Sequence, residues 1–203
     1  MRISSQIVFV FLLMLASVAA YSQPWPSEIW HDGNVVLENG DTLKGKIKYD
    51  LKQDLIQYNL PNQRTEALSS RKVLSFEIFD ETEKRYRLFF ALPYAGGQTQ
   101  YRTPVFFELL AEGKLTLLTR EALEFKTYSS PYYLGSYSRE VLVYHYFFLD
   151  SDGEITEFKG SKADLLNMMG KQSSEVEKYM KANRLKIDDR NDFARIVIYY
   201  NSI

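Results

Sequence analysis

Hydrophobic residues change their spacing once along this chain, close to Gly160, and this change limits the possible folds more than any other feature. Before it, from Gly33 to Phe158, apolar runs are short, rich in β-branched and aromatic residues, and separated by turn residues every ~8–12 positions, which is typical of antiparallel strands. After it, apolar residues recur at helical spacing. The sequence predicts an α+β, mainly β chain: an antiparallel sheet or partly closed barrel with a C-terminal cap of three short helices.

Strands are expected wherever a short apolar run lies between turn residues. After an N-terminal hairpin, the expected strands cover residues 55–60, 73–79, 85–92, 105–110, 114–119, 141–149 and 154–158. The run at 141–149 is nearly all apolar, which indicates a strand buried on both faces. Residues 128–138, YSSPYYLGSYS, are rich in turn formers, so we expect a loop there.

The N-terminal hairpin is predicted from Asn-Gly at residues 39–40, because both residue types tolerate positive φ. We expect Leu37 to lie opposite Leu43 and Val35 opposite Gly45. A two-residue loop would instead pair Val36 with Leu43, and a slip of one residue reverses every side chain. The expected apolar face consists of Val35, Leu37, Leu43, Ile47 and Tyr49.

Three helices are expected after Gly160, each starting at a capping residue. Ser161 begins the first, Ser174 with Glu177 forms a capping box for the second, and Asp189 begins the third. Their apolar faces are Leu165, Leu166 and Met169; Val176 and Met180; and Phe193, Ile196, Val197 and Tyr200. Because no linker separates sheet and helices, residues 23–203 are predicted to form one domain, with the helical cap at about residues 161–201.

Residues 1–22 have the pattern of a secretory signal peptide. Arg2 precedes an apolar run at residues 7–15, which is shorter than the ~20 apolar residues of a membrane-spanning helix. Ala-Tyr-Ser at residues 20–22 predicts cleavage before Gln23. The chain has no cysteine to carry a lipid. We expect an exported protein, periplasmic or cell-surface associated, that is not a lipoprotein and has no integral membrane span in its mature chain.

Nucleic acid is not an expected partner, because the chain has a formal net charge of −1 and no basic run. The stretch from residue 36 to 50 nevertheless resembles the first motif of Sm-type RNA-binding barrels. The resemblance rests on Val36, Leu37, Gly40, Gly45, Ile47 and Asp50. Asp54 stands where that family contacts RNA, and no Arg-Gly of the second Sm motif follows. The stretch therefore predicts a hairpin without RNA binding.

No catalytic motif is complete. Ser69 and Lys72 have the spacing of the nucleophile motif of penicillin-recognising enzymes, but a strand-like run follows where that motif needs a helix. His31 and His145 are too few for a three-histidine zinc site. Residues 150–154 resemble part of a calcium loop, without the carboxylates at its two ends. We predict no catalytic residue, no metal site and no cofactor.

Tyrosines form the one candidate binding site. Within the expected loop at residues 128–138 they are Tyr128, Tyr132, Tyr133 and Tyr137. Aromatic rings in a Ser/Pro/Gly-rich loop are typical of adaptable contact surfaces. The alternative is that these rings only cover the rim of the core.

Taken together, several stretches resemble a group of exported β-rich proteins common in Bacteroidetes. They are WHDGNVVLENGDTLKGKI, FFELLAEGKLTLLTRE, YFFLDSDGEITEF and IYYN. The resemblance implies export and a β-rich fold, and it transfers no catalytic residue. We expect a non-catalytic envelope protein that acts by contact with a protein or glycan partner. The alternative is a small carboxylate-dependent hydrolase or carbohydrate-active enzyme of the periplasm, recognisable by two close carboxylates in a cleft, one of raised pKa.

Overall fold

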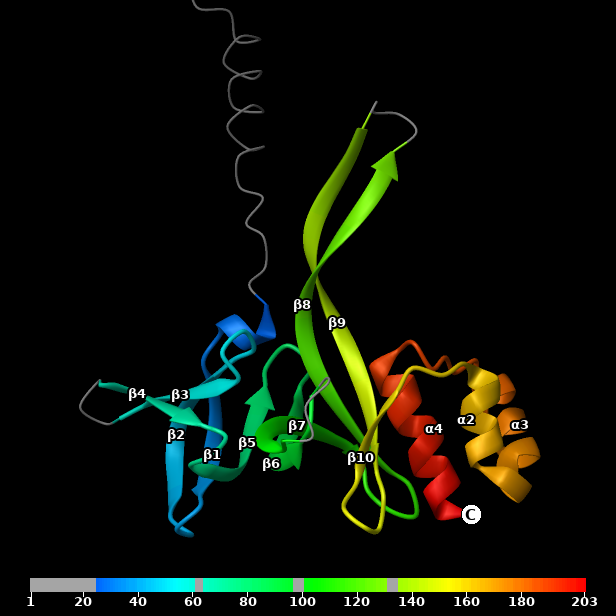
Figure 1. Ribbon diagram of the computed structural model, residues 1–203, viewed down its shortest axis with the longest axis horizontal. Helices are drawn as coiled ribbons and strands as arrows, with labels where there is room; N and C mark the ends of the chain where they lie inside the picture. Colours follow the sequence, from blue (N-terminus) through cyan, green and yellow to red (C-terminus); the bar gives the residue numbers. More distant parts are fainter. Residues whose placement is uncertain (1–24, 61–63, 97–100, 131–134) are drawn as a thin grey trace, which may run out of the picture.

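One open, ten-stranded antiparallel sheet forms the body of the protein (Figure 1), in a computed structural model that describes residues 25–60, 64–96, 101–130 and 135–203. The strand order is β10-β9-β8-β7-β6-β5-β1-β2-β3-β4. The strands are β1 (His31–Leu37), β2 (Thr42–Asp50), β3 (Leu55–Asn59), β4 (Thr65–Ser69), β5 (Val73–Asp80), β6 (Arg85–Tyr94), β7 (Thr103–Ala111), β8 (Thr116–Ser130), β9 (Gly135–Leu149) and β10 (Ile155–Phe158). A short 3₁₀ helix, η1 (Pro26–Glu28), precedes β1. The predicted mainly β fold is confirmed, with an open sheet.

The N-terminal hairpin forms, but both expected registers are wrong. Leu43 lies opposite Val35 rather than opposite Leu37 or Val36. The amide of Leu37 instead donates to the carbonyl of Asp41, around a loop in which Gly40 has φ +89°. Compared with the preferred register, the pairing is shifted by two residues, and such a shift leaves every side chain on its expected face. Of the predicted face, Val35, Ile47 and Tyr49 are buried, and Leu37 and Leu43 are partly buried against the same cluster.

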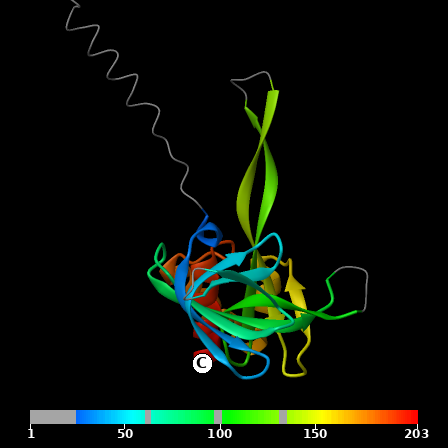
Figure 2. The same cartoon turned by 90° about the vertical axis from the view of Figure 1, so that its left-hand side faces the viewer.

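The loop expected at residues 128–138 is wrong at residues 128–130 and 135–138, which belong to two long strands; residues 131–134 lie outside the described residues. β8 runs to Ser130 and β9 starts at Gly135, with continuous pairing from Thr116 with Leu149 to Ser130 with Gly135. β7 pairs with β8 only as far as Thr119, and β10 pairs with β9 only from Tyr146. Beyond those points, residues 120–130 and 135–145 form a two-stranded ribbon, here called the arm, which projects from the body in both views (Figures 1 and 2).

Three helices follow the sheet: α2 (Lys162–Met168), α3 (Ser173–Asn183) and α4 (Arg190–Ser202). The predicted caps of the first and third are confirmed, because Ser161 forms a capping box with Asp164, and Asp189 accepts a hydrogen bond from the amide of Asp192. The predicted Ser174 cap is wrong. α3 starts one residue earlier and continues from a single 3₁₀ turn, η2 (Gly170–Gln172), so it has no side-chain cap.

The helical cap packs on one face of the C-terminal strands, with α4 next to the sheet and α2 and α3 outside it (Figure 1). Leu165, Val176 and Phe193 are fully buried, in one cluster with Leu117 and Phe148 of the sheet. Phe147 points to the opposite face and packs with Phe107 and Leu118. The prediction of burial on both faces of β9 is thus confirmed at residues 146–148. A third cluster, built around Phe76, Phe89 and Phe106, fills the N-terminal half.

Candidate functional site

The candidate tyrosines lie on the arm. Tyr128 and Tyr137 face each other across β8 and β9, with ring centroids 5.5 Å apart and ring planes at 22°. Tyr137 is 55% exposed. Tyr132 and Tyr133 lie outside the described residues. The structure therefore brings together two of the four predicted residues, on paired strands instead of a loop.

A cationic pair lies beside the tyrosine pair on the same face of the arm. Lys126 and Arg139 are direct cross-strand partners, two residues along each strand from Tyr128 and Tyr137. The guanidinium carbon of Arg139 lies 4.9 Å from the centroid of the Tyr128 ring. Arg139 and Tyr137 therefore both contact the Tyr128 ring, and these three residues are here called the stack.

The carboxylates of the arm all engage groups outside this stack. Glu124 contacts Nε2 of His145 at 3.0 Å. Glu140 pairs with Lys52 of the β2–β3 turn at 3.2 Å, and the side chain of Glu121, at the base of the arm, pairs with Arg87. Within the described ranges, no carboxylate forms an ion pair with Lys126 or Arg139. The outer part of the arm is therefore aromatic and cationic.

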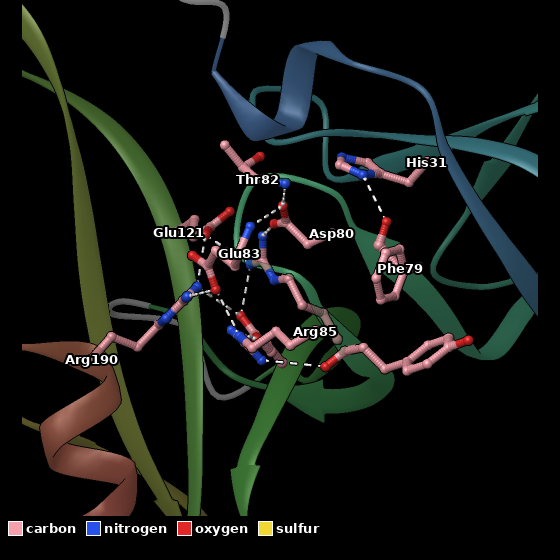
Figure 3. A network of polar contacts seen from close by, with 11 residues as sticks. His31, Phe79, Asp80, Thr82, Glu83, Arg85, Glu121 and Arg190 are labelled. Atoms are coloured by element: carbon pink, nitrogen blue, oxygen red, sulfur yellow. Dashed lines mark hydrogen bonds and ion pairs between the residues drawn. The ribbon is translucent and has the colours of Figure 1, made fainter.

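A buried ionic network joins the base of the arm to the body and to the helical cap (Figure 3). Arg87 on β6 donates from one nitrogen to Glu108 on β7 and to Glu121 on β8, both at 2.7 Å. Arg190 at the start of α4 reaches Glu121 at 3.4 Å and also pairs with Glu83 in the β5–β6 turn. Further members are Asp80, 3.3 Å from Arg87, and Arg85, 2.6 Å from Glu108.

The two central carboxylates of this network have opposite pKa shifts. Burial would raise the pKa of Glu108, but the surrounding charges of Arg87, Arg190 and Arg85 outweigh it and lower that pKa. Burial raises the pKa of Glu121, and the negative charge of Glu108 adds to the rise while Arg87 opposes it. A carboxylate pair of this kind is what the hydrolase alternative requires.

The surroundings of the pair argue against substrate access. The side chains of Glu108 and Glu121 are 1% and 4% exposed, and arginine nitrogens already occupy their oxygens. A hydrolase needs room between its carboxylates for a sugar and a water. The network therefore has the features of a structural link that holds sheet, arm and cap together. Removing one partner would leave a buried charge uncompensated.

A second group of carboxylates lines a hollow of about 430 Å³ between β9, β10 and α2. Each has a partner already. Asp150 accepts the amides of Asp152 and Glu154 in the β9–β10 turn, and Glu154 pairs with Arg102. Glu157 contacts Lys159 at 2.8 Å and His145 at 3.2 Å, and these contacts outweigh its partial burial and lower its pKa.

The remaining residues singled out in the sequence have contacts typical of structural roles. Ser69 ends β4 and accepts the amide of Lys72 in a turn, so the pair does not lie on a helix. Asp54, at the Sm-like position, accepts the hydroxyl of Tyr49 at 2.6 Å and pairs with Arg120 at 3.1 Å. His31 is buried with Nδ1 3.2 Å from the carbonyl of Phe79.

Sequence reasoning missed both the ionic network and the cationic pair. For the network a signal exists: Arg87 and Glu108 each interrupt an apolar strand, at RYRLFF and VFFELL. A single charge inside such a run predicts a buried partner of opposite charge. For Lys126 and Arg139 the signal appears only once the register of β8 and β9 is known.

Comparison of the chain with protein-family models, curated proteins and solved structures finds no match. Among the described residues, no helix is long and apolar enough to cross a membrane. In the same part of the chain, no three His, Cys, Asp or Glu side chains are grouped so as to hold a metal ion.

Proposed function

We propose that this chain is an exported, non-catalytic envelope protein that acts by contact and that presents Tyr128 and Tyr137 on its arm to a protein or glycan partner. The observation that carries the proposal is the arm itself. It extends beyond its neighbouring strands on both sides and exposes aromatic side chains, with Phe125 75% and Tyr137 55% exposed. Exposed aromatic rings on a fixed support are typical of contact surfaces.

The anchoring of the arm supports a role in binding. A two-stranded hairpin alone is marginally stable in water. Here β8 and β9 continue into the sheet and the core, and contacts of His145 with Glu157 of β10 and of Glu140 with Lys52 attach the arm to the body. The two tyrosines are therefore held in place before a partner arrives, which lowers the entropy cost of binding.

Export is supported by the signal-peptide pattern at residues 1–22, which lie outside the described part of the chain. A binding surface on a projecting arm favours a macromolecular partner in the cell envelope over a small molecule that would bind in a pocket. The burial of the Glu108–Glu121 pair and its pairing with arginines support a contact role over hydrolysis.

The test is photo-crosslinking in cells that export the protein. A benzophenone side chain is placed at position 137 in one variant and at position 86 in another. Tyr86 is the matched control, because it is a 66% exposed tyrosine on β6, away from the arm. We expect irradiation to give a higher-mass adduct from position 137 and none from position 86.

Mass spectrometry and sugar analysis of the adduct identify the partner as protein or glycan. Equal adducts from both positions, or none from position 137, contradict the proposal. A second readout removes the outer arm by joining Glu124 to Val141, which are direct cross-strand partners, through Asn-Gly. That variant should keep its fold and lose the partner.

A further inference from the structure

Charge is segregated along the arm. Its three carboxylates, Glu121, Glu124 and Glu140, contact Arg87, His145 and Lys52 respectively, all outside the outer stack. Lys126 and Arg139 remain beyond them without an acidic partner among the described residues. A chain with a net charge of −1 thus exposes a local positive surface on its most prominent element.

The register adds an energetic argument. Lys126 and Arg139 are directly opposite each other, and like charges in that position destabilise a strand pair. The contact of Arg139 with the Tyr128 ring offsets part of this cost, but it leaves both positive charges uncompensated. An anionic group placed between the two side chains would relieve the repulsion and pair with both.

The stack beside this pair defines the rest of the site. The Tyr128 ring is contacted by both Arg139 and Tyr137, and Tyr137 itself is 55% exposed. A tyrosine offers an apolar ring face with a hydroxyl at its rim. A sugar ring, which has an apolar face and a rim of hydroxyl groups, matches that surface.

We infer that the arm binds an anionic glycan, a saccharide that carries carboxylate or phosphate groups. Lys126 and Arg139 pair with the anionic group, and Tyr137 packs against a neighbouring sugar ring. This inference rests on the proposed contact function and narrows its partner. A long nucleic acid fits less well, because the net charge of −1 provides no extended basic track.

The experiment measures binding of the full mature chain to three oligosaccharides of similar length. They are an oligogalacturonide with carboxylates, a phosphorylated mannan fragment and neutral dextran. We expect binding to one or both anionic probes, weakening as salt rises because exposed charges are screened, and no binding to dextran. The two anionic probes distinguish carboxylate from phosphate as the recognised group.

Single variants locate the site. K126Q and R139Q should each weaken binding about tenfold, the effect of losing one charge-assisted hydrogen bond. Y137A should weaken it by a similar factor. K44Q and Y86A are the matched controls, an exposed lysine of β2 and an exposed tyrosine of β6, and should bind like the unchanged protein. Because Tyr137, Lys126 and Arg139 lie outside the core clusters, the melting temperature should not fall.

The inference would be overturned by no binding to either anionic probe, by equal binding to dextran, or by unchanged binding of K126Q and R139Q. Binding only to phosphatidylglycerol vesicles or to an acidic peptide, measured in the same way, would also overturn it. These results are distinct from failure of the contact function. If position 137 still crosslinks to a partner in cells while no anionic glycan binds, the contact function stands and the glycan assignment is wrong. If both fail, the arm is not the contact surface.

Discussion

At the scale of single residues, two carboxylates of the ionic network that accept hydrogen bonds from the same arginine can differ in how their ionisation affects stability. Glu108 and Glu121 both accept hydrogen bonds from Arg87, yet the pKa of Glu108 is lowered and that of Glu121 is raised. The reason is geometric. Glu108 is paired with Arg85 and Arg87 and also approaches Arg190, and these charges outweigh its burial. At Glu121 burial raises the pKa, and the charge of Glu108 adds to the rise.

Glu108→Gln is expected to destabilise the fold at neutral pH by about 3–5 kcal/mol, because it leaves buried arginines short of a charge. A carboxyl with a lowered folded pKa contributes stability above its unfolded pKa of about 4.3 and loses it as pH falls through the folded pKa. The difference from the unchanged protein should therefore be full at pH 7 and shrink below pH ~4.3. Urea unfolding at several pH values measures it.

The effect of Glu121→Gln on stability should depend on pH in the opposite direction. Because the folded pKa of Glu121 is raised, ionisation of this group costs stability as pH rises through that pKa. The loss of unfolding free energy caused by Glu121→Gln should therefore be smaller at pH 8 than at pH 4. The same urea series serves as the test. A Glu121→Gln penalty that grows with pH would contradict this assignment of the two carboxylates.

Gly33 offers a residue-scale test of the sheet. A Cβ at this position would lie 2.2 Å from the carbonyl oxygen of Glu77 on β5, so β1 and β5 would have to separate. We expect Gly33→Ala to lower the free energy of unfolding by ~1–3 kcal/mol, the usual penalty of overpacking. Gly135→Ala is the control, because its Cβ meets nothing within 4 Å. Equal melting temperatures for the two variants would contradict the β1–β5 register.

At the scale of elements, the sequence predicted those whose signals are local. The Asn-Gly turn, the Ser161 and Asp189 caps and most alternating strands depend on neighbours along the chain, and they form. β4 (TEALS) was missed because it has little hydrophobic pattern and pairs only with β3. The outer arm was missed because cross-strand partners override its turn-rich composition.

The helical cap is expected to be part of the core. Helices of this length are marginal alone, and their buried residues cover Leu117, Tyr146 and Phe148 of the sheet. Truncation after Gly160 would expose these side chains, each worth about 1.5–3 kcal/mol, against a typical domain stability of about 5–15 kcal/mol. The truncated chain should therefore fail to melt cooperatively in calorimetry.

The variant lacking the outer arm is the control for this truncation. It removes residues 125–140, and none of the described residues in this range belongs to a core cluster. It should melt cooperatively near the midpoint of the full-length protein. A truncated chain that is soluble, monomeric and equally stable would instead make the helices a separate module.

At the scale of the whole molecule, three hydrophobic clusters lie on a single sheet, two of them on opposite faces of its C-terminal strands. The N-terminal cluster extends to Phe106 of β7, which also contributes Ala111 to the cluster under the cap, and two further connections link the two halves. β7 pairs with β8, and Arg190 of the cap reaches Glu83 in the β5–β6 turn.

Half of the candidate site could be predicted from the sequence. The tyrosines could be predicted because composition alone suggests a contact surface. Their cationic neighbours could not, because only the register brings them together.

These connections predict one unfolding transition for the whole chain, and the protein contains natural probes at its two ends. Both tryptophans, Trp25 and Trp30, precede β1, whereas α2, α3 and α4 all belong to the cap. Tryptophan fluorescence therefore reports on the N-terminal half, and circular dichroism at 222 nm reports mainly on the cap. In urea the two signals should give the same midpoint and slope, as two-state unfolding requires.

Arg190→Gln provides the sharper form of this experiment. It removes a charge that links α4 to Glu83 and Glu121, so the cap should lose stability by several kcal/mol. If sheet and cap form one cooperative unit, the midpoints from fluorescence and circular dichroism should fall together. If the circular dichroism midpoint falls alone, the cap unfolds independently, and residues 23–203 would comprise two units rather than the single predicted domain.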